Sequence, residues 1–224
     1  MKLSPAQAQD DLAFWLNQDR EHNLFYLLGF AEPELKREAE RIYESYDRAL
    51  RCGDLQAALA IVPRAQTFKD GALAFVRRPG NAGRAGYIWP SFIEHTKMEI
   101  DAMVRRLGPG LTTREEVCLG DRMLADHAAF ASSLLDPIRQ AGLADVARSA
   151  SRSTADVANR CATETLETLV TLSRKAQADL DSFMQQPTVG QGAIIHPLLA
   201  DHVVREGRRF GDFLSAPIDD ERQV

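Results

Sequence analysis

The sequence lacks the features that mark several classes of protein. It has only three cysteines in 224 residues, Cys52, Cys118 and Cys161, with no CxxC pair among them. Such usage excludes a cysteine-rich scaffold or a zinc–cysteine site, so we expect reduced thiols in the cytoplasm. The N-terminal residues MKLSPAQAQDD contain no apolar segment followed by a cleavage site, so we expect no export. Phosphate-binding glycine loops and a nucleophile elbow are also absent, which leaves phosphate binding and acyl transfer without support.

Long apolar runs and an excess of positive charge are missing too. The most apolar stretch, LFYLLGFA, is interrupted by a glycine and flanked by charged residues, so we expect no membrane span. The net charge of −5 argues against nucleic acid or an anionic membrane as a partner. With 45% hydrophobic and 26% charged residues, the composition is that of a globular protein with a core.

Helical periodicity dominates the chain, and we find no alternating strand pattern bounded by hairpin turns. In the first half we predict a helix split or bent near Pro63 and a loop at RRPGNAGRAG; in the second half we predict an N-cap at TTREE and a loop at QQPTVGQGA. The sequence therefore predicts an all-α fold of eight main helices. The expected helices are 9–30, 34–51, 55–77, 88–107, a helix from 112 to about 135, 138–159, 163–185 and 195–214.

The two halves of the sequence resemble each other. Glu21-His22 corresponds to Asp126-His127, and Glu94-His95 with Glu99 corresponds to Asp201-His202 with Glu206. The offset between paired residues changes only from 104 to 107 positions across a whole half. Internal self-similarity of this kind is a fold-level signal. We therefore predict an internal duplication, with one four-helix bundle in residues 1–110 and a pseudo-symmetric second bundle in residues 111–224.

Polar residues interrupt an apolar stripe on the fourth predicted helix of each half. His95 and Glu99 continue a stripe formed by Ile88, Phe92 and Met103, spaced three or four residues apart. His202 and Glu206 take the same places among Ile195, Leu199 and Phe210. A carboxylate facing a core is costly unless it is paired or bound to a metal, and two groups at i,i+4 can hold one ion.

A histidine on the first helix of each half completes the candidate ligand set. His22 lies among apolar residues, and His127 repeats it. Two histidines and one glutamate per half suit zinc, or an iron or manganese centre whose open positions take a small molecule or dioxygen. The two sets could occupy separate sites or converge into one dinuclear site. The predicted metal ligands are His22, His95, Glu99, His127, His202 and Glu206.

Other polar residues carry weaker signals. His196 is not repeated, which favours a surface or capping role. Lys69 and Lys175 are repeated, but a helical lysine is usually solvated or paired locally, and we favour that interpretation. Asp19 corresponds to Leu124 in the repeat, so it could contribute to the metal site of one half at most. The competing hypothesis for the inward histidines and glutamates is a hydrogen-bonded core network in a non-catalytic helical scaffold or interaction module.

These motifs resemble a bacterial family of tandem-repeat metalloproteins of unknown function, which contain two ferritin-like or haemerythrin-like four-helix bundles. The resemblance rests on FWLNQDREHNLFYLLGFAEPELKREA with MLADHAAFASSLLDP, and on IWPSFIEHTKMEI with IIHPLLADHVVREG. It implies a metal site formed by the six residues above. It implies no established reaction.

The chain departs from better-understood relatives in its motif order. Ferritin-like carboxylate proteins use Glu-x-x-His, whereas this chain has His-x-x-x-Glu and one convincing carboxylate per half. Haemerythrin-like oxygen carriers need more histidines than either half supplies. We therefore expect a cytoplasmic metal-binding protein, monomeric or homodimeric, with a redox or metal-handling role and no assigned reaction.

Overall fold

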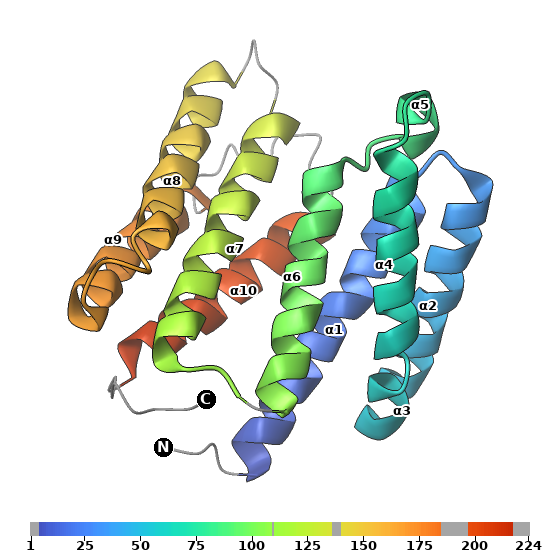
Figure 1. The fold of residues 1–224 in the computed structure, drawn as a ribbon, viewed down its shortest axis with the longest axis horizontal. Helices are drawn as coiled ribbons and strands as arrows, with labels where there is room; N and C mark the ends of the chain where they lie inside the picture. Colours follow the sequence, from blue (N-terminus) through green and yellow to red (C-terminus); the bar gives the residue numbers. More distant parts are fainter. Residues whose placement is uncertain (1–4, 109, 136–139, 185–196, 217–224) are drawn as a thin grey trace. The chain divides into compact units, whose positions relative to one another are not determined.

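The structure, a computed structural model, describes residues 5–108, 110–135, 140–184 and 197–216. These residues are almost entirely helical, and none of them lies in a β-strand (Figure 1). Eight helices have at least fifteen residues, as the periodicity predicts, and two are short. They are α1 Pro5–Gly29, α2 Pro33–Arg51, α3 Leu55–Leu59, α4 Val62–Val76, α5 Ala82–Ala85, α6 Pro90–Leu107, α7 Thr113–Leu134, α8 Ala141–Asn159, α9 Leu166–Met184 and α10 Pro197–Ser215.

The predicted all-α fold is confirmed. No helix in the described ranges is both long and apolar enough to cross a membrane. The described chain divides into two compact units, which we call the first half, up to Pro109, and the second half, from Gly110 on.

Prolines and caps set the helix boundaries of the first half. Pro33 and Pro90 open α2 and α6, at positions where a missing N–H costs nothing because it would have no helical partner. The expected break near Pro63 is present, since α3 ends at Leu59 and α4 begins at Val62. The predicted loop before α6 is only partly correct, because residues 82–85 form the short helix α5.

Aromatic side chains fill the core of the first half between α1, α4 and α6. Tyr26 stacks on Phe30 with ring centroids 5.6 Å apart. It also makes edge contacts with Phe68 at 5.5 Å and Phe92 at 5.4 Å. Because these side chains are buried, they hold α1 against both α4 and α6 and give each helix one orientation.

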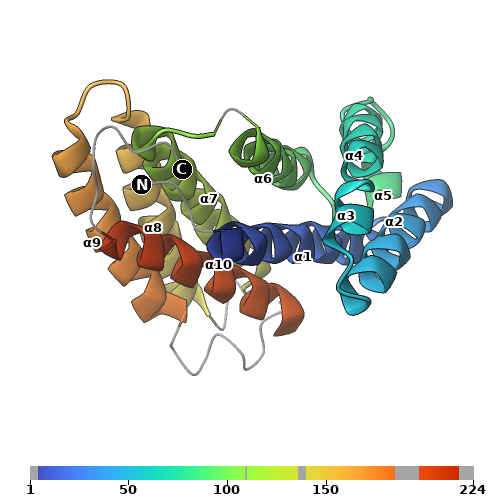
Figure 2. The same cartoon turned by 90° about the horizontal axis from the view of Figure 1, so that it is seen from below.

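The second half is formed by α7, α8, α9 and α10, which are drawn from green to red in Figure 2. Thr112 and Glu115 form a capping box at the start of α7, as TTREE predicts. Helix α10 contacts both α7 and α9. Gly120 on α7 allows a close approach to α10, because a Cβ atom there would lie 2.1 Å from the ring of Phe210. The predicted loop at residues 185–193 lies outside the described residues, as do Ile195 and His196.

The cysteine prediction is wrong for two of the three residues. Cys118 on α7 and Cys161, just after α8, form a disulfide with their Cα atoms 5.9 Å apart. Helices α7 and α8 pack along each other, and this brings together two cysteines that are 43 positions apart in the sequence. Cys52 is a free and exposed thiol.

Candidate metal centre

Two helices position the three predicted ligands of the first half. Helix α1 carries His22, and α6 carries His95 and Glu99 one turn apart. All three are buried, with 1%, 2% and 2% of their surfaces exposed. His95 and Glu99, which interrupt the predicted apolar stripe, therefore do lie inside the core. Ile88 is also buried, although α6 begins two residues later, at Pro90.

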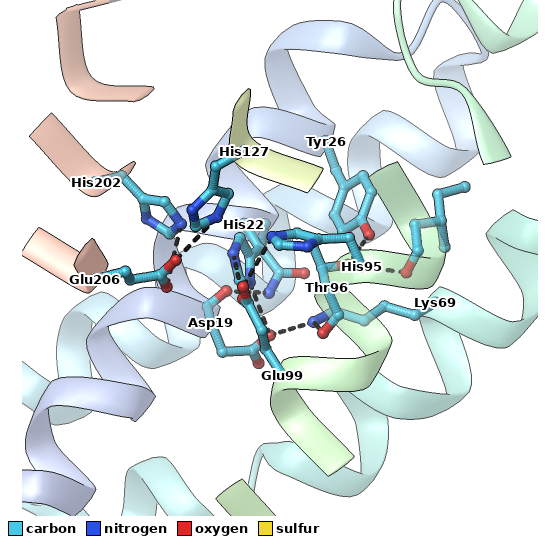
Figure 3. Close-up of polar contacts among 12 residues, drawn as sticks. Asp19, His22, Tyr26, Lys69, His95, Thr96, Glu99, His127, His202 and Glu206 are labelled. Carbon is cyan, nitrogen blue, oxygen red and sulfur yellow. Dashed lines mark hydrogen bonds and ion pairs between the residues drawn. The ribbon is translucent and has the colours of Figure 1, made fainter. Parts of the chain in front are cut away.

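Glu99 contacts a different histidine with each of its carboxylate oxygens (Figure 3). His22 Nε2 lies 3.0 Å from Oε2, and His95 Nε2 lies 2.8 Å from Oε1. The two imidazole rings approach edge-on, with centroids 6.5 Å apart. The carboxylate thus has one imidazole nitrogen in contact with each oxygen.

The second half contains the same arrangement on α7 and α10. His127 Nε2 lies 3.0 Å from Glu206 Oε2, and His202 Nε2 lies 3.4 Å from Oε1 (Figure 3). The ring centroids of the two histidines are 6.3 Å apart. All three side chains are buried. In each half, therefore, the structure brings together the three residues that the sequence predicts.

The buried charges of the first half stabilise one another. Burial alone would raise the pKa of Glu99, but His95 and His22 hold it well below its usual range. Burial likewise opposes protonation of His22, yet the carboxylates of Glu99 and Asp19 raise its pKa. The histidines and the glutamate thus form a mutually dependent set in which removing one charge leaves another buried without compensation.

The donor atoms and their spacing suit a transition metal ion. Two ligand atoms held at about 2.0–2.2 Å from one ion, at angles between a right angle and the tetrahedral angle, lie about 2.8–3.6 Å apart. The four His–Glu contacts, at 2.8–3.4 Å, fall in that range. Independently of these pairwise contacts, the buried histidines and glutamates of the described chain include groups that could hold a metal ion, with ligand atoms within 4.8 Å of one another. Neutral imidazole and carboxylate together favour zinc, iron or manganese.

A charged pair that sequence reasoning missed lies behind His22. The Lys69 ammonium on α4 donates hydrogen bonds to Asp19 Oδ1 at 2.5 Å and to the Thr96 carbonyl at 2.9 Å. The prediction that Lys69 is solvated or paired locally is therefore wrong, because its side chain is fully buried and its partner lies 50 positions away. The available signal was the position of Asp19, one turn before His22 on the same helix face.

A different polar contact occupies the interior of the second half. Asp121 on α7 and Ser173 on α9 are both fully buried, and Ser173 Oγ lies 2.5 Å from Asp121 Oδ2. Burial raises the pKa of Asp121 to about 7, although the bond to Ser173 opposes the shift. Lys175, the counterpart of Lys69 in the predicted repeat, is exposed.

Comparisons with known proteins support the fold and leave the activity unassigned. No protein-family model matches the chain. An uncharacterised protein of Acanthamoeba polyphaga mimivirus is 24% identical over 252 residues, which cover 90% of this chain and 78% of the viral protein. A crystal structure of an uncharacterised protein from Bacillus cereus has a TM-score of 0.79 at 15% identity and covers 95% of this chain and 92% of its own. The chain thus shares the fold of the bacterial protein, and neither name states a function.

Proposed function

We propose that this protein binds transition metal ions, iron, manganese or zinc, through the buried histidines and glutamates of its two halves. The observation that carries the proposal is the repeated arrangement in which two imidazole nitrogens contact the two oxygens of one buried glutamate. The resemblance to tandem-repeat metalloproteins and the predicted duplication add support, because all three ligand types recur at matching positions. With one such group per half, we expect two ions per chain.

The protein's own residues would exclude water and fix the ligands. Each candidate ligand is at most 2% exposed, so the surrounding side chains would keep bulk water away from a bound ion. A bound ion would supply Lewis acidity or, if it is iron or manganese, one-electron chemistry. We therefore propose a redox or metal-handling role for the protein. Dioxygen or a small molecule would bind at the open coordination positions of the ion.

Metal content of the purified protein tests the proposal. Elemental analysis of the full chain should find about two transition metal ions per molecule, and Glu99→Gln with Glu206→Gln should remove them. Two exposed acids on the same helices, which pair with arginines, provide the matched controls Glu94→Gln and Asp201→Asn. The control variants should keep the metal. A metal-free wild-type protein that also ignores added Zn²⁺, Fe²⁺ and Mn²⁺ would rule the proposal out.

The second candidate function is a helical scaffold whose histidines and glutamates form a core hydrogen-bond network. Its support is that the distances of 2.8–3.4 Å also suit direct His–Glu contacts in a protein without metal. The two candidates differ in their response to chelators. A scaffold keeps its thermal stability in the presence of a chelator, whereas a metal-dependent core loses stability.

We also propose that the protein is cytoplasmic. The disulfide between Cys118 and Cys161 is the observation against this location, because cytoplasmic disulfides are rare. Alkylation of free thiols in intact cells, followed by mass spectrometry, tests it. Alkylation of Cys118 in cells would support a cytoplasmic location, whereas a Cys118 that remains in the disulfide would contradict it.

A further inference from the structure

Asp19 lies behind His22, on the side away from Glu99. The two residues are one turn apart on α1, and Asp19 Oδ1 lies 3.8 Å from His22 Nδ1. The other ring nitrogen, Nε2, faces Glu99. A carboxylate on the Nδ1 side favours a proton on that nitrogen and leaves the Nε2 lone pair directed at the ligand position.

Lys69 holds Asp19 in this place. Its ammonium bonds Asp19 Oδ1 and the Thr96 carbonyl on α6, so it ties α1 and α4 to the helix that carries His95 and Glu99. Asn23 adds a bond from Nδ2 to the Asp19 carbonyl at 2.7 Å. Asp19 is therefore a fixed carboxylate inside the core.

The second half is built differently around its histidine. The residue one turn before His127 is Leu124, a buried apolar side chain that cannot accept a hydrogen bond. One buried aspartate of this half, Asp121, lies six positions before His127 and contacts Ser173. The two ligand sets use the same residue types, but only the helix of the first half carries a carboxylate at this position.

We propose that Asp19, held by Lys69, is a positioning residue for His22, a ligand of the proposed metal site. This inference rests on the proposed metal binding. Groups that orient a histidine ligand typically change metal affinity by about 10- to 100-fold when they are removed. Removal of the Asp19 carboxylate should therefore weaken metal binding by about that factor.

Titration of the metal-free full chain with Co²⁺, followed by visible absorption, tests the inference. Asp19→Asn should weaken Co²⁺ binding about 10-fold or more and shift the absorption band of the bound ion. Because Asp19→Asn leaves the Lys69 charge buried, the double variant Asp19→Leu/Lys69→Met removes both charges and installs the leucine found in the second half. The matched control is Asp121→Asn, the same change at a buried aspartate of the second half.

The nitrogen NMR shifts of the histidine side chains, with Zn²⁺ bound, distinguish a positioning role from a purely structural one. A purely structural role of Asp19 would leave the His22 shifts unchanged. The His22 signals, assigned by their loss in His22→Gln, should show the proton on Nδ1 and should shift in both Asp19 variants. An unchanged Co²⁺ affinity in both Asp19 variants would overturn the inference. Equal weakening by Asp121→Asn would do the same. A wild-type chain that binds no Co²⁺ instead refutes the proposed function itself.

Discussion

Lys69 donates a hydrogen bond of 2.5 Å to Asp19 in the core of the first half, and neither side chain has more than 4% of its surface exposed. A lysine and an aspartate buried together are stable only as a pair, since each alone would be a charge without compensation in a medium of low dielectric. The pair joins α1 to α4 immediately behind His22, so the stability of this half and the placement of a candidate ligand depend on the same contact.

Substitution of Lys69 should strongly destabilise the first half. Lys69→Met leaves Asp19 buried without its cation and should lower the free energy of unfolding by about 3–5 kcal/mol. The only two tryptophans, Trp15 and Trp89, both lie in this half, so urea unfolding followed by tryptophan fluorescence reports on it selectively. Lys175→Met, at an exposed lysine of the second half, should change stability by less than about 0.5 kcal/mol. Similar effects of the two substitutions would contradict the buried pair.

Metal should stabilise the first half through Glu99. Zn²⁺ at about 100 times its dissociation constant should raise the free energy of unfolding by about 2.7 kcal/mol, because it binds the folded state alone. Glu99→Gln should abolish this gain in tryptophan-monitored unfolding, whereas Glu94→Gln, at an exposed position of the same helix, should keep it. A gain that survives in Glu99→Gln would show that Zn²⁺ binds elsewhere.

The second half should lose stability as the pH rises toward 7. Asp121 has a pKa of about 7 in the folded chain against an ordinary value of 3.8, so the folded state retains a proton that the unfolded state loses. Between these values each pH unit removes stability, to a total on the order of 4 kcal/mol, and above about pH 7 the loss is complete. Below pH 4 both states are protonated and the penalty disappears.

The hydrogen bond from Ser173 offsets only part of the effect of burial on Asp121. Ser173 Oγ donates to Asp121 Oδ2 at 2.5 Å and also lies 2.8 Å from the Leu169 carbonyl, so its single proton is shared between two acceptors. Asp121→Asn should therefore flatten the pH dependence. Hydrogen exchange of peptides from α7 and α9 between pH 5 and 8, corrected for the intrinsic rate, measures it. An equally steep profile in the variant would assign the effect to another group.

Reduction of the disulfide should destabilise the second half. The Cys118–Cys161 bond closes a segment of 43 residues, for which loop-closure entropy predicts a contribution of about 3–4 kcal/mol. The double variant Cys118→Ser/Cys161→Ser should lower the melting temperature, and dithiothreitol should then have no further effect. Cys52→Ser, at the free exposed thiol, should melt like the wild type. Two free thiols at Cys118 and Cys161 in non-reducing peptide mapping of the purified protein would contradict the bond.

Local sequence pattern determined the helices and the candidate ligands. Prolines at helix starts, the capping box at Thr112 and apolar spacing of three and four residues act within one or two turns, so they are readable without a fold. The same spacing placed His95 and Glu99 on an inward face before any contact was known. The predicted duplication remains a prediction, and it singled out the six ligand candidates by their recurrence.

Tertiary structure decided which of these side chains meet and which other groups join them. The partner of Lys69 is 50 positions away, and that of Cys118 is 43 positions away. No periodicity within a helix encodes such a distance, because it depends on which faces α1 and α4, or α7 and α8, turn toward each other. Solvation is the usual state of a helical lysine, and only the enclosing core makes Lys69 an exception. The sequence by itself thus determined the helices and the ligand types, and packing decided the charge environment of each ligand set.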